Sequence, residues 1–292
     1  MKTLPDGARV ERGEGGLERL VLAGAEGEGC VYLHGAHVAH FQPKGARPVL
    51  WVSRKSQFSA GKPIRGGVPV CFPWFGPKAG EPAAPVHGFA RLRPWSLEDV
   101  EPDVSRGLRA ALRLGSDDET RRYFPHDFVA RLLVTVSRVL RLELEVRNTG
   151  ATPFRFEEAL HSYFAVGDSR RLAISGLEGA GYLDKADAMA RKTLLAPLAI
   201  TGETDRVFNG HRGPITIEDP MWRRRLVVER TGSSTAVVWN PWAAKAKAMP
   251  DFGDDEWTGM VCVESTNAMD DALTLDAGAS HEITTTIAVR LA

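Results

Sequence analysis

The sequence predicts an all-β protein whose antiparallel strands pack as one large sandwich. Short apolar runs rich in Val, Leu, Tyr, Phe and Trp alternate with segments that contain Gly and Pro, which is typical of an antiparallel β protein. The clearest strand is residues 140–147, where Leu or Val alternates with Arg or Glu and so forms one buried and one solvent-facing side. The chain of 292 residues contains no internal repeat and no linker-like segment, and we expect a single domain over residues 1–292.

Composition and charge exclude several kinds of partner. The 37 basic and 37 acidic residues give a formal net charge of zero, so no overall field attracts nucleic acid or an anionic membrane. No apolar run reaches the length of a membrane span, and the N-terminus lacks the apolar core of a signal peptide. The three cysteines have neither metal-ligand spacing nor the pattern of a disulfide framework. We therefore expect a cytoplasmic protein that binds neither nucleic acid nor membrane and, lacking an obvious exposed apolar helix, is a monomer.

The N-terminal part of the chain predicts four short strands, over residues 17–22, 30–33, 38–41 and 49–52. A Gly-rich turn over residues 24–29 separates the first two. Runs of four to six residues with this spacing and composition favour strands over helices.

Residues 61–76 predict a structured loop rather than a regular element. The segment contains four Gly and three Pro residues with large aromatic residues between them, so its backbone can approach a neighbouring group closely. Arg65 precedes two glycines and can present its guanidinium without a neighbouring side chain in the way. Taken alone, however, an arginine in a turn is usually a surface residue. His87 and Arg91 follow in a second Gly-containing segment, where a lone histidine is usually structural.

The central part of the chain gives the strongest strand signal, from about residue 108 to 147. A turn over residues 148–153 follows, and residues 154–166 are predicted to return as one strand. Neighbouring side chains of a strand point to opposite faces. One face would therefore carry Glu157, Ala159, His161 and Tyr163. The other would carry Phe154, Phe156, Leu160 and Phe164. His161 would stand apart from the main apolar surface, beside Tyr163.

Residues 167–220 are rich in loop-forming residues. We expect one helical stretch near residues 184–192 and an acid in a loop at Asp205. Residues 224–229 and 234–239 have the pattern of a hairpin, joined by a turn that contains Gly.

The C-terminal part predicts a loop or one short helix over residues 245–257 and strands over residues 260–264 and 283–290. In the first of these strands Met260, Cys262 and Glu264 would point the same way.

His161 and Glu264 are the two candidates for acid–base chemistry. A carboxylate and an imidazole can act as general base and general acid and so transfer two protons to and from a substrate at neutral pH. Glu264 follows three apolar residues, which is an unusual setting for a carboxylate without a partner. Taken singly, a histidine in a strand is more often a hydrogen-bonded core residue than a catalyst, so the two residues gain weight only together.

Six segments, in this order, resemble the glucose-6-phosphate 1-epimerases (hexose-6-phosphate mutarotases), a branch of the aldose 1-epimerase, or galactose mutarotase-like, superfamily. Any one of them is a weak motif, but six in family order are specific. They are residues 61–76, 87–95, 158–164, 204–208, 238–242 and 260–264.

The resemblance implies a galactose mutarotase-like β-supersandwich with a sugar cleft on one face. It implies an isomerase that interconverts the α and β anomers of glucose 6-phosphate and related hexose 6-phosphates. Carried over position by position, it assigns catalysis to His161 and Glu264, and substrate binding to Arg65, His87, Arg91 and Asp205. Within that set, the two arginines bind the phosphate side and Asp205 holds sugar hydroxyls. Val86 and Ser162 depart from the family pattern, where Gln and Thr are common.

Anomers interconvert when the sugar ring opens and closes again after the aldehyde carbon rotates. Opening removes a proton from the anomeric hydroxyl, which suits Glu264, and delivers one to the ring oxygen, which suits His161. Because this reaction also proceeds slowly unaided, a positioned acid and base suffice, and we expect no cofactor and no metal. A phosphate dianion needs local cations in a chain of zero net charge, and arginines offer a planar fork of N–H donors.

Two alternatives remain open at this point. An aldose 1-epimerase for unphosphorylated sugars would have no need of Arg65 and Arg91. A non-catalytic carbohydrate-binding protein with the same fold would have no need of an acid–base pair.

Overall fold

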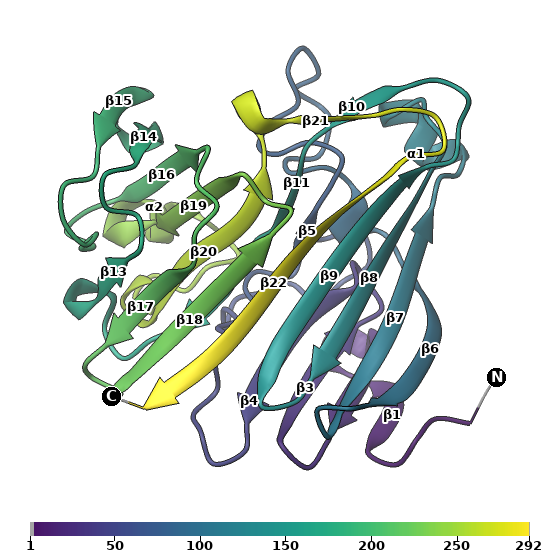
Figure 1. The fold of residues 1–292 in the computed structure, drawn as a ribbon, viewed down its shortest axis with the longest axis horizontal. Coiled ribbons are helices and arrows are strands. Elements are labelled where there is room, and N and C mark those ends of the chain that lie inside the picture. The colour runs from purple at the N-terminus through teal and green to yellow at the C-terminus, as the bar shows by residue number, and fades with distance from the viewer. Residues whose placement is uncertain (1–2, 292) are drawn as a thin grey trace.

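The computed structural model describes residues 3–291, which form two eight-stranded sheets, one four-stranded sheet and one two-stranded sheet. All pairings between the named strands are antiparallel, and this confirms the all-β prediction. In Figure 1 one large sheet runs from β17 and β18 across the long strand β22 to β9, β8, β7 and β6.

The first eight-stranded sheet carries Asp205 and Glu264 on its strands, and we call it the site sheet. Its strand order is β15-β14-β16-β19-β20-β11-β5, and β12 also pairs with β20. Its strands are β5 (Val70–Cys71), β11 (Glu158–Leu160), β12 (Tyr163–Ala165), β14 (Gly181–Asp184), β15 (Ala190–Thr193), β16 (Thr204–Asn209), β19 (Thr235–Asn240) and β20 (Met260–Asn267).

The second eight-stranded sheet, the back sheet, has the order β13-β17-β18-β22-β9-β8-β7-β6. Its strands are β6 (Ser96–Asp103), β7 (Gly107–Gly115), β8 (Phe128–Val136), β9 (Val139–Asn148), β13 (Ala173–Ser175), β17 (Ile215–Asp219), β18 (Arg224–Thr231) and β22 (Ser280–Leu291). The alternation predicted for residues 140–147 is confirmed, because the apolar residues of that stretch are fully buried and the charged ones between them are not.

The remaining strands form two small sheets. The four-stranded sheet comprises β1 (Ala8–Arg12), β2 (Glu18–Ala23), β3 (Gly27–Tyr32) and β4 (His37–Pro43). The two-stranded sheet pairs β10 (Phe154–Phe156) with β21 (Leu273–Leu275). Three of the four N-terminal strand predictions are thus confirmed, whereas residues 49–52 make only isolated bridges at Leu50 and Val52.

Helical structure is confined to short pieces. The α-helices are α1 (Asp118–Tyr123) and α2 (Trp242–Ala248). Single 3₁₀ turns lie at Glu14–Gly16, Ala90–Leu92, Ser169–Arg171, Lys185–Asp187, Glu256–Gly259 and Met269–Asp271. Within residues 3–291, no helix is both long and apolar enough to cross a membrane.

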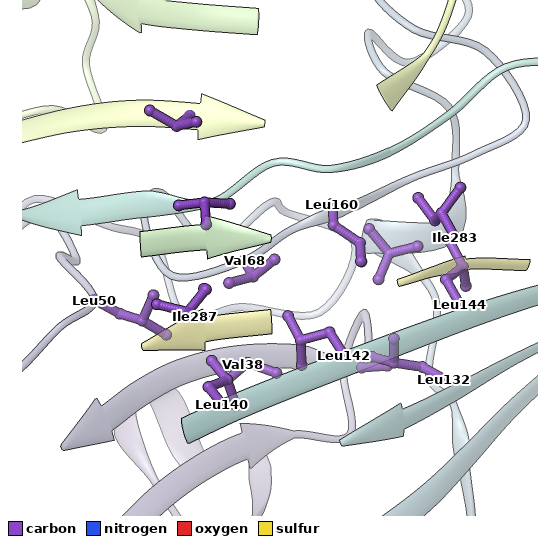
Figure 2. Close-up of a cluster of buried hydrophobic side chains, with 14 of the residues drawn as sticks. Val38, Leu50, Val68, Leu132, Leu140, Leu142, Leu144, Leu160, Ile283 and Ile287 are labelled. Atoms are coloured by element: carbon purple, nitrogen blue, oxygen red, sulfur yellow. The ribbon is translucent and has the colours of Figure 1, made fainter. Parts of the chain in front are cut away.

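The core lies between the sheets. Apolar side chains of β9 and β22 point toward those of β11 and of the loop before β5, as Figure 2 shows for Leu142, Ile283, Leu160 and Val68. Each fully buried aliphatic side chain of this kind stabilises the fold by about 1.5–3 kcal/mol relative to an exposed one. The site sheet thus packs with its apolar side chains against the back sheet.

The prediction of one strand over residues 154–166 is wrong in one respect. The chain there forms β10, β11 and β12, with breaks at Glu157 and at His161–Ser162. At both breaks a loop takes over the backbone hydrogen bond, since the Glu157 N–H donates to Pro73 O at 2.9 Å and the His161 N–H to Pro69 O at 3.1 Å. The predicted facing is confirmed, because the four apolar residues lie in the core and His161 stacks on Tyr163.

Two further predictions are wrong. The helix expected near residues 184–192 is instead the hairpin of β14 and β15, which pair from Gly181 to Thr193 around a turn whose last residues have positive φ. The expected hairpin of residues 224–239 does not form. β18 pairs with β17 and β22, whereas β19 pairs with β16 and β20, so the chain crosses from the back sheet to the site sheet here. The helix expected within residues 245–257 begins earlier, at Trp242.

Candidate active site

A cavity of about 200 Å³ on the site sheet brings together five of the six predicted site residues. These five are Arg65, His87, His161, Asp205 and Glu264. Arg91 is not among the lining residues. A larger depression of about 490 Å³ lies over β14, β15 and β16, but it contains no acid–base pair.

The strand register places His161 beside Glu264. Glu264 lies in the middle of β20, where Val261 and Val263 face the core and Cys262 packs in a second apolar cluster. β11 and β12 both pair with β20, and His161 occupies the gap between them. His161 Nε2 consequently lies 3.4 Å from Glu264 Oε1.

Burial shifts the acid and the base in opposite directions. Glu264 is 1% exposed, and burial, reinforced by the negative charge of Asp205, raises its pKa well above the ordinary range. Burial and the positive charges of Arg91 and Arg65 lower the pKa of His161. Glu264 Oε2 and His161 Nδ1 have no hydrogen-bond partner within the described chain. Buried polar atoms are rarely left unpaired unless a ligand or a reaction uses them.

His87 occupies a strained backbone position at the edge of the cavity. Its φ is +64°, in the left-handed region that non-glycine residues seldom adopt. Its ring packs edge-on against Phe75 at 4.7 Å and against His161 at 5.7 Å between centroids. Nδ1 accepts the Gly76 N–H at 3.2 Å, and burial lowers the pKa. The neutral ring therefore carries its proton on Nε2.

Gly88 makes this position of His87 accessible. Its φ is +73°, and a Cβ there would lie 2.0 Å from the carbonyl oxygen of Phe72. Only glycine lets the two backbone segments approach so closely.

Arg65 is held in place by an acid and a phenol. Its Nε donates to Asp251 Oδ2 at 3.1 Å and its Nη1 donates to the Tyr163 hydroxyl at 3.1 Å. Although burial disfavours the charged guanidinium, Tyr163 and Asp251 outweigh this effect and raise the pKa. The guanidinium thus stays charged at the cavity wall.

Arg91 lies behind the cavity as a buried cation without an acidic partner. It is 9% exposed, its Nη2 donates to Val86 O at 2.7 Å, and its Nε has no partner. No carboxylate of residues 3–291 forms an ion pair with it. Burial lowers its pKa, and its charge reaches the rings of His87 and His161. An uncompensated buried cation is costly unless an anion joins it.

The sequence did not indicate two lysines that also line the cavity, Lys185 and Lys245. Lys185 Nζ lies 3.4 Å from Asp205 Oδ2, and Lys245 pairs with Glu203 at 2.7 Å. The wall is completed by Phe75, Tyr163, Val237, Trp239 and Met249. Lys185 was hidden because its segment was expected to be helical, whereas a β-hairpin directs it toward Asp205.

The described residues contain no group of three or more His, Cys, Asp or Glu side chains with the geometry of a metal site. The three cysteines are free and buried.

Comparison with known proteins agrees over most of the chain. The family model described as Aldose 1-epimerase matches residues 20–288. A protein of Cenchrus ciliaris named "Putative glucose-6-phosphate 1-epimerase" is 37% identical over 283 residues, which cover 93% of this chain and 84% of the relative. A protein of Salmonella typhimurium with the same name is 36% identical over 253 residues, covering 86% of this chain and 84% of the relative.

Solved structures share the fold. The crystal structure titled as a "putative mutarotase" from Salmonella typhimurium matches with a TM-score of 0.91 and 32% identity, covering 100% of this chain and 96% of that chain. A galactose mutarotase-like protein from Clostridium acetobutylicum matches with a TM-score of 0.76 at 15% identity, covering 98% of each chain. The extent of these matches, over a β fold of this topology, shows that the chain belongs to the aldose 1-epimerase family.

Proposed function

We propose that this protein interconverts the α and β anomers of glucose 6-phosphate and related hexose 6-phosphates. The observation that carries the proposal is the buried pair of His161 and Glu264, 3.4 Å apart on the floor of a sugar-sized cavity. Two arginines, Arg65 in the cavity wall and Arg91 behind it, support a phosphorylated substrate. Arg91 has no acidic partner, and relatives named for glucose 6-phosphate share about a third of the sequence.

The chemistry requires two proton transfers and no net change. In the opening direction Glu264 takes the proton of the anomeric hydroxyl while His161 gives one to the ring oxygen, and the bond between the anomeric carbon and the ring oxygen breaks. The aldehyde carbon then rotates. As the ring closes on the other face, Glu264 gives its proton to the aldehyde oxygen and His161 takes one back from the hydroxyl group that attacks. Arg65 and Arg91 would bind the phosphate, and Asp205, Lys185 and His87 would hold hydroxyl groups.

To be active, His161 and Glu264 together must carry one ionisable proton beyond the form with glutamate and neutral histidine. The forms with neutral glutamic acid and neutral histidine, and with glutamate and histidinium, contain the same number of protons. Burial favours the neutral form in the free enzyme, and transfer to the ionised form on substrate binding would prepare both groups for ring opening.

Exchange NMR between the anomers of glucose 6-phosphate tests the proposal directly. We expect the protein to accelerate exchange for this sugar far more than for free glucose or galactose. Equal acceleration of the free sugars would contradict the phosphosugar assignment, and no acceleration of any sugar would favour a binding protein.

The site assignment predicts the effects of two substitutions. Glu264→Gln and His161→Ala should each remove most of the exchange, because each deletes one of the two proton carriers. Folding is checked by circular dichroism and thermal melting. Full activity in either folded variant would refute the assigned roles.

We further propose that the protein works as a cytoplasmic monomer. Three free, buried cysteines suit a reducing compartment. Light scattering coupled to size exclusion gives the mass in solution, and an active dimer with an inactive monomer would contradict the proposal.

A further inference from the structure

An unbroken line of contacts leads from Asp251 through Arg65 and Tyr163 to His161. Asp251 Oδ2 accepts the Arg65 Nε–H and lies 3.1 Å from Nη2 of the same residue. Arg65 Nη1 donates to the Tyr163 hydroxyl at 3.1 Å. The ring of Tyr163 stacks on that of His161 with centroids 4.7 Å apart and an angle of 9°. His161 therefore contacts Tyr163 directly, and Tyr163 in turn holds Arg65.

Tyr163, in the middle of this line of contacts, is held by neighbours on several sides. Trp51 also stacks on the Tyr163 ring at 5.8 Å and 20°, and Trp239 packs edge-on at 5.9 Å. The Tyr163 N–H donates to the carbonyl of Gly67, two residues after Arg65, at 2.9 Å. In a close-packed setting of this kind, a displacement of the Tyr163 hydroxyl moves the ring and its stacked neighbour together.

Arg65 still has donors for a bound anion. A guanidinium has five N–H groups, and the contacts with Asp251 and Tyr163 leave at least one on each Nη nitrogen. The Arg65 side chain is 21% exposed and lines the cavity, whereas Asp251 does not line it. Asp251 thus fixes the direction of the guanidinium without occupying the space of the ligand.

We propose that the substrate's phosphate raises the rate of ring opening, as well as the affinity, because Arg65 transmits its binding through Tyr163 to His161. In this arrangement Asp251 and Tyr163 are positioning residues, and the phosphate acts as an activator of the acid–base pair. The inference rests on the proposed function. It follows the general rule that binding energy from a non-reacting part of a substrate can be used to align the reacting groups.

The first experiment separates rate from affinity. Tyr163→Phe removes the hydroxyl that Arg65 contacts but keeps the ring and its stacking. We expect kcat for glucose 6-phosphate to fall about tenfold, the cost of one hydrogen bond to a charged group, while KM changes less than twofold and kcat for free glucose falls by a smaller factor. Tyr182→Phe is the matched control, since Tyr182 packs against Phe208 away from the cavity, and it should behave as wild type. An unchanged kcat, or equal losses for both sugars, would overturn the inference.

The second experiment supplies the phosphate separately. Phosphite dianion added to wild type should accelerate anomerisation of free glucose in a saturable way, after subtraction of the rate with phosphite alone, and should not do so in Tyr163→Phe. Absence of activation in wild type would overturn the inference even if glucose 6-phosphate is the preferred substrate. If wild type does not discriminate between glucose 6-phosphate and glucose, the proposed function itself fails.

Asp251→Asn tests the other end of the line of contacts. The amide keeps an acceptor but loses the charge that fixes Arg65, so kcat for glucose 6-phosphate should fall about tenfold without a rise in KM. Asp254→Asn is the control, because Asp254 lies in the same loop and pairs with Lys55 at the surface. A higher KM with unchanged kcat would show that Arg65 serves affinity alone and would overturn the inference.

Discussion

At the scale of single residues, the cavity concentrates groups whose burial has no compensation inside the protein. His161 and Glu264 each leave one polar atom unpaired, and Arg91 is a cation without an anion. Such groups destabilise the empty fold, and they are the ones the proposed reaction would use. The arrangement follows the general observation that perturbed ionisable groups gather at functional sites.

The shifted pKa values of His161 and Glu264 predict that activity persists to an unusually low pH. Burial lowers the pKa of His161 well below 6.5, so the pair takes up a second, inactivating proton only at a pH well below 6.5. We expect kcat/KM to hold as pH falls through 6.5 and to decrease only below it. Glucose 6-sulfate is the suitable substrate, because a phosphate titrates near pH 6 itself.

The decrease of activity at high pH is set by Glu264. Burial raises the pKa of Glu264, so the pair keeps its single proton to a pH above the ordinary range of a glutamate, and activity falls where that proton is lost. A loss of activity with a midpoint near 6.5 on the acid side would contradict the lowered histidine pKa.

Substitution of Arg91 should weaken substrate binding without lowering the free energy of unfolding. Arg91→Met removes an uncompensated buried cation, which is often neutral or stabilising, while KM for glucose 6-phosphate should rise at least about tenfold for the lost charged hydrogen bond. Urea unfolding and steady-state kinetics measure the two effects.

The neighbouring Arg93 is a control with the opposite expectation. It pairs with Asp117 and Glu119, so Arg93→Met should lower stability and leave KM unchanged. The prediction for Arg91 is contradicted if Arg91→Met is the less stable of the two variants, or if its KM is that of wild type.

At the scale of elements, strands of the site sheet supply the acid–base pair and loops supply the rest of the cavity. β20 presents Glu264 from a strand that is buried on both faces. His161 lies in a break between strands, and Arg65 and His87 lie in Gly-rich loops. At this break the His161 N–H donates to Pro69 O, in the loop before β5.

The turn at His87 and Gly88 predicts a large effect of adding one methyl group. Gly88→Ala would place a Cβ 2.0 Å from Phe72 O at a positive φ, so it should destabilise the fold by more than about 2 kcal/mol and displace His87. Gly80→Ala is the control, since Gly80 has a similar φ of +75° but no atom within 4 Å of the added Cβ. Gly80→Ala should destabilise the fold by only about 1 kcal/mol. Equal midpoints of thermal unfolding would contradict the prediction.

At the scale of the whole molecule, the sequence predicts the fold class and most strands, but not how the strands are partnered. The alternation in β9 and the apolar runs of β2 and β20 are local signals, and the structure confirms them. The crossing from β18 to β19 is not visible locally, because two adjacent strands joined by a Gly-containing turn have the pattern of a hairpin whether or not they pair. Lys185 was missed for a related reason, since its contact with Asp205 depends on the pairing of β14 with β16.

Substrate binding should stabilise the molecule as a whole. A ligand that binds only the folded state at one hundred times its Kd adds about 2.7 kcal/mol to the free energy of unfolding, so glucose 6-phosphate should raise Tm by several degrees at such concentrations. Free glucose at the same concentration should raise it much less. Equal shifts in differential scanning calorimetry would contradict phosphate recognition by the two arginines.

The place of β11 in the site sheet has a consequence for how the protein is made. Leu160 pairs on one side with Val70 and on the other with Ser265, so the strand beside His161 joins segments that leave the ribosome far apart in time. During synthesis β11 and β5 must wait for β20, with one edge unpaired and open to association with other chains. Contacts this distant in sequence slow folding, and the acid–base pair forms only when nearly the whole chain has been synthesised.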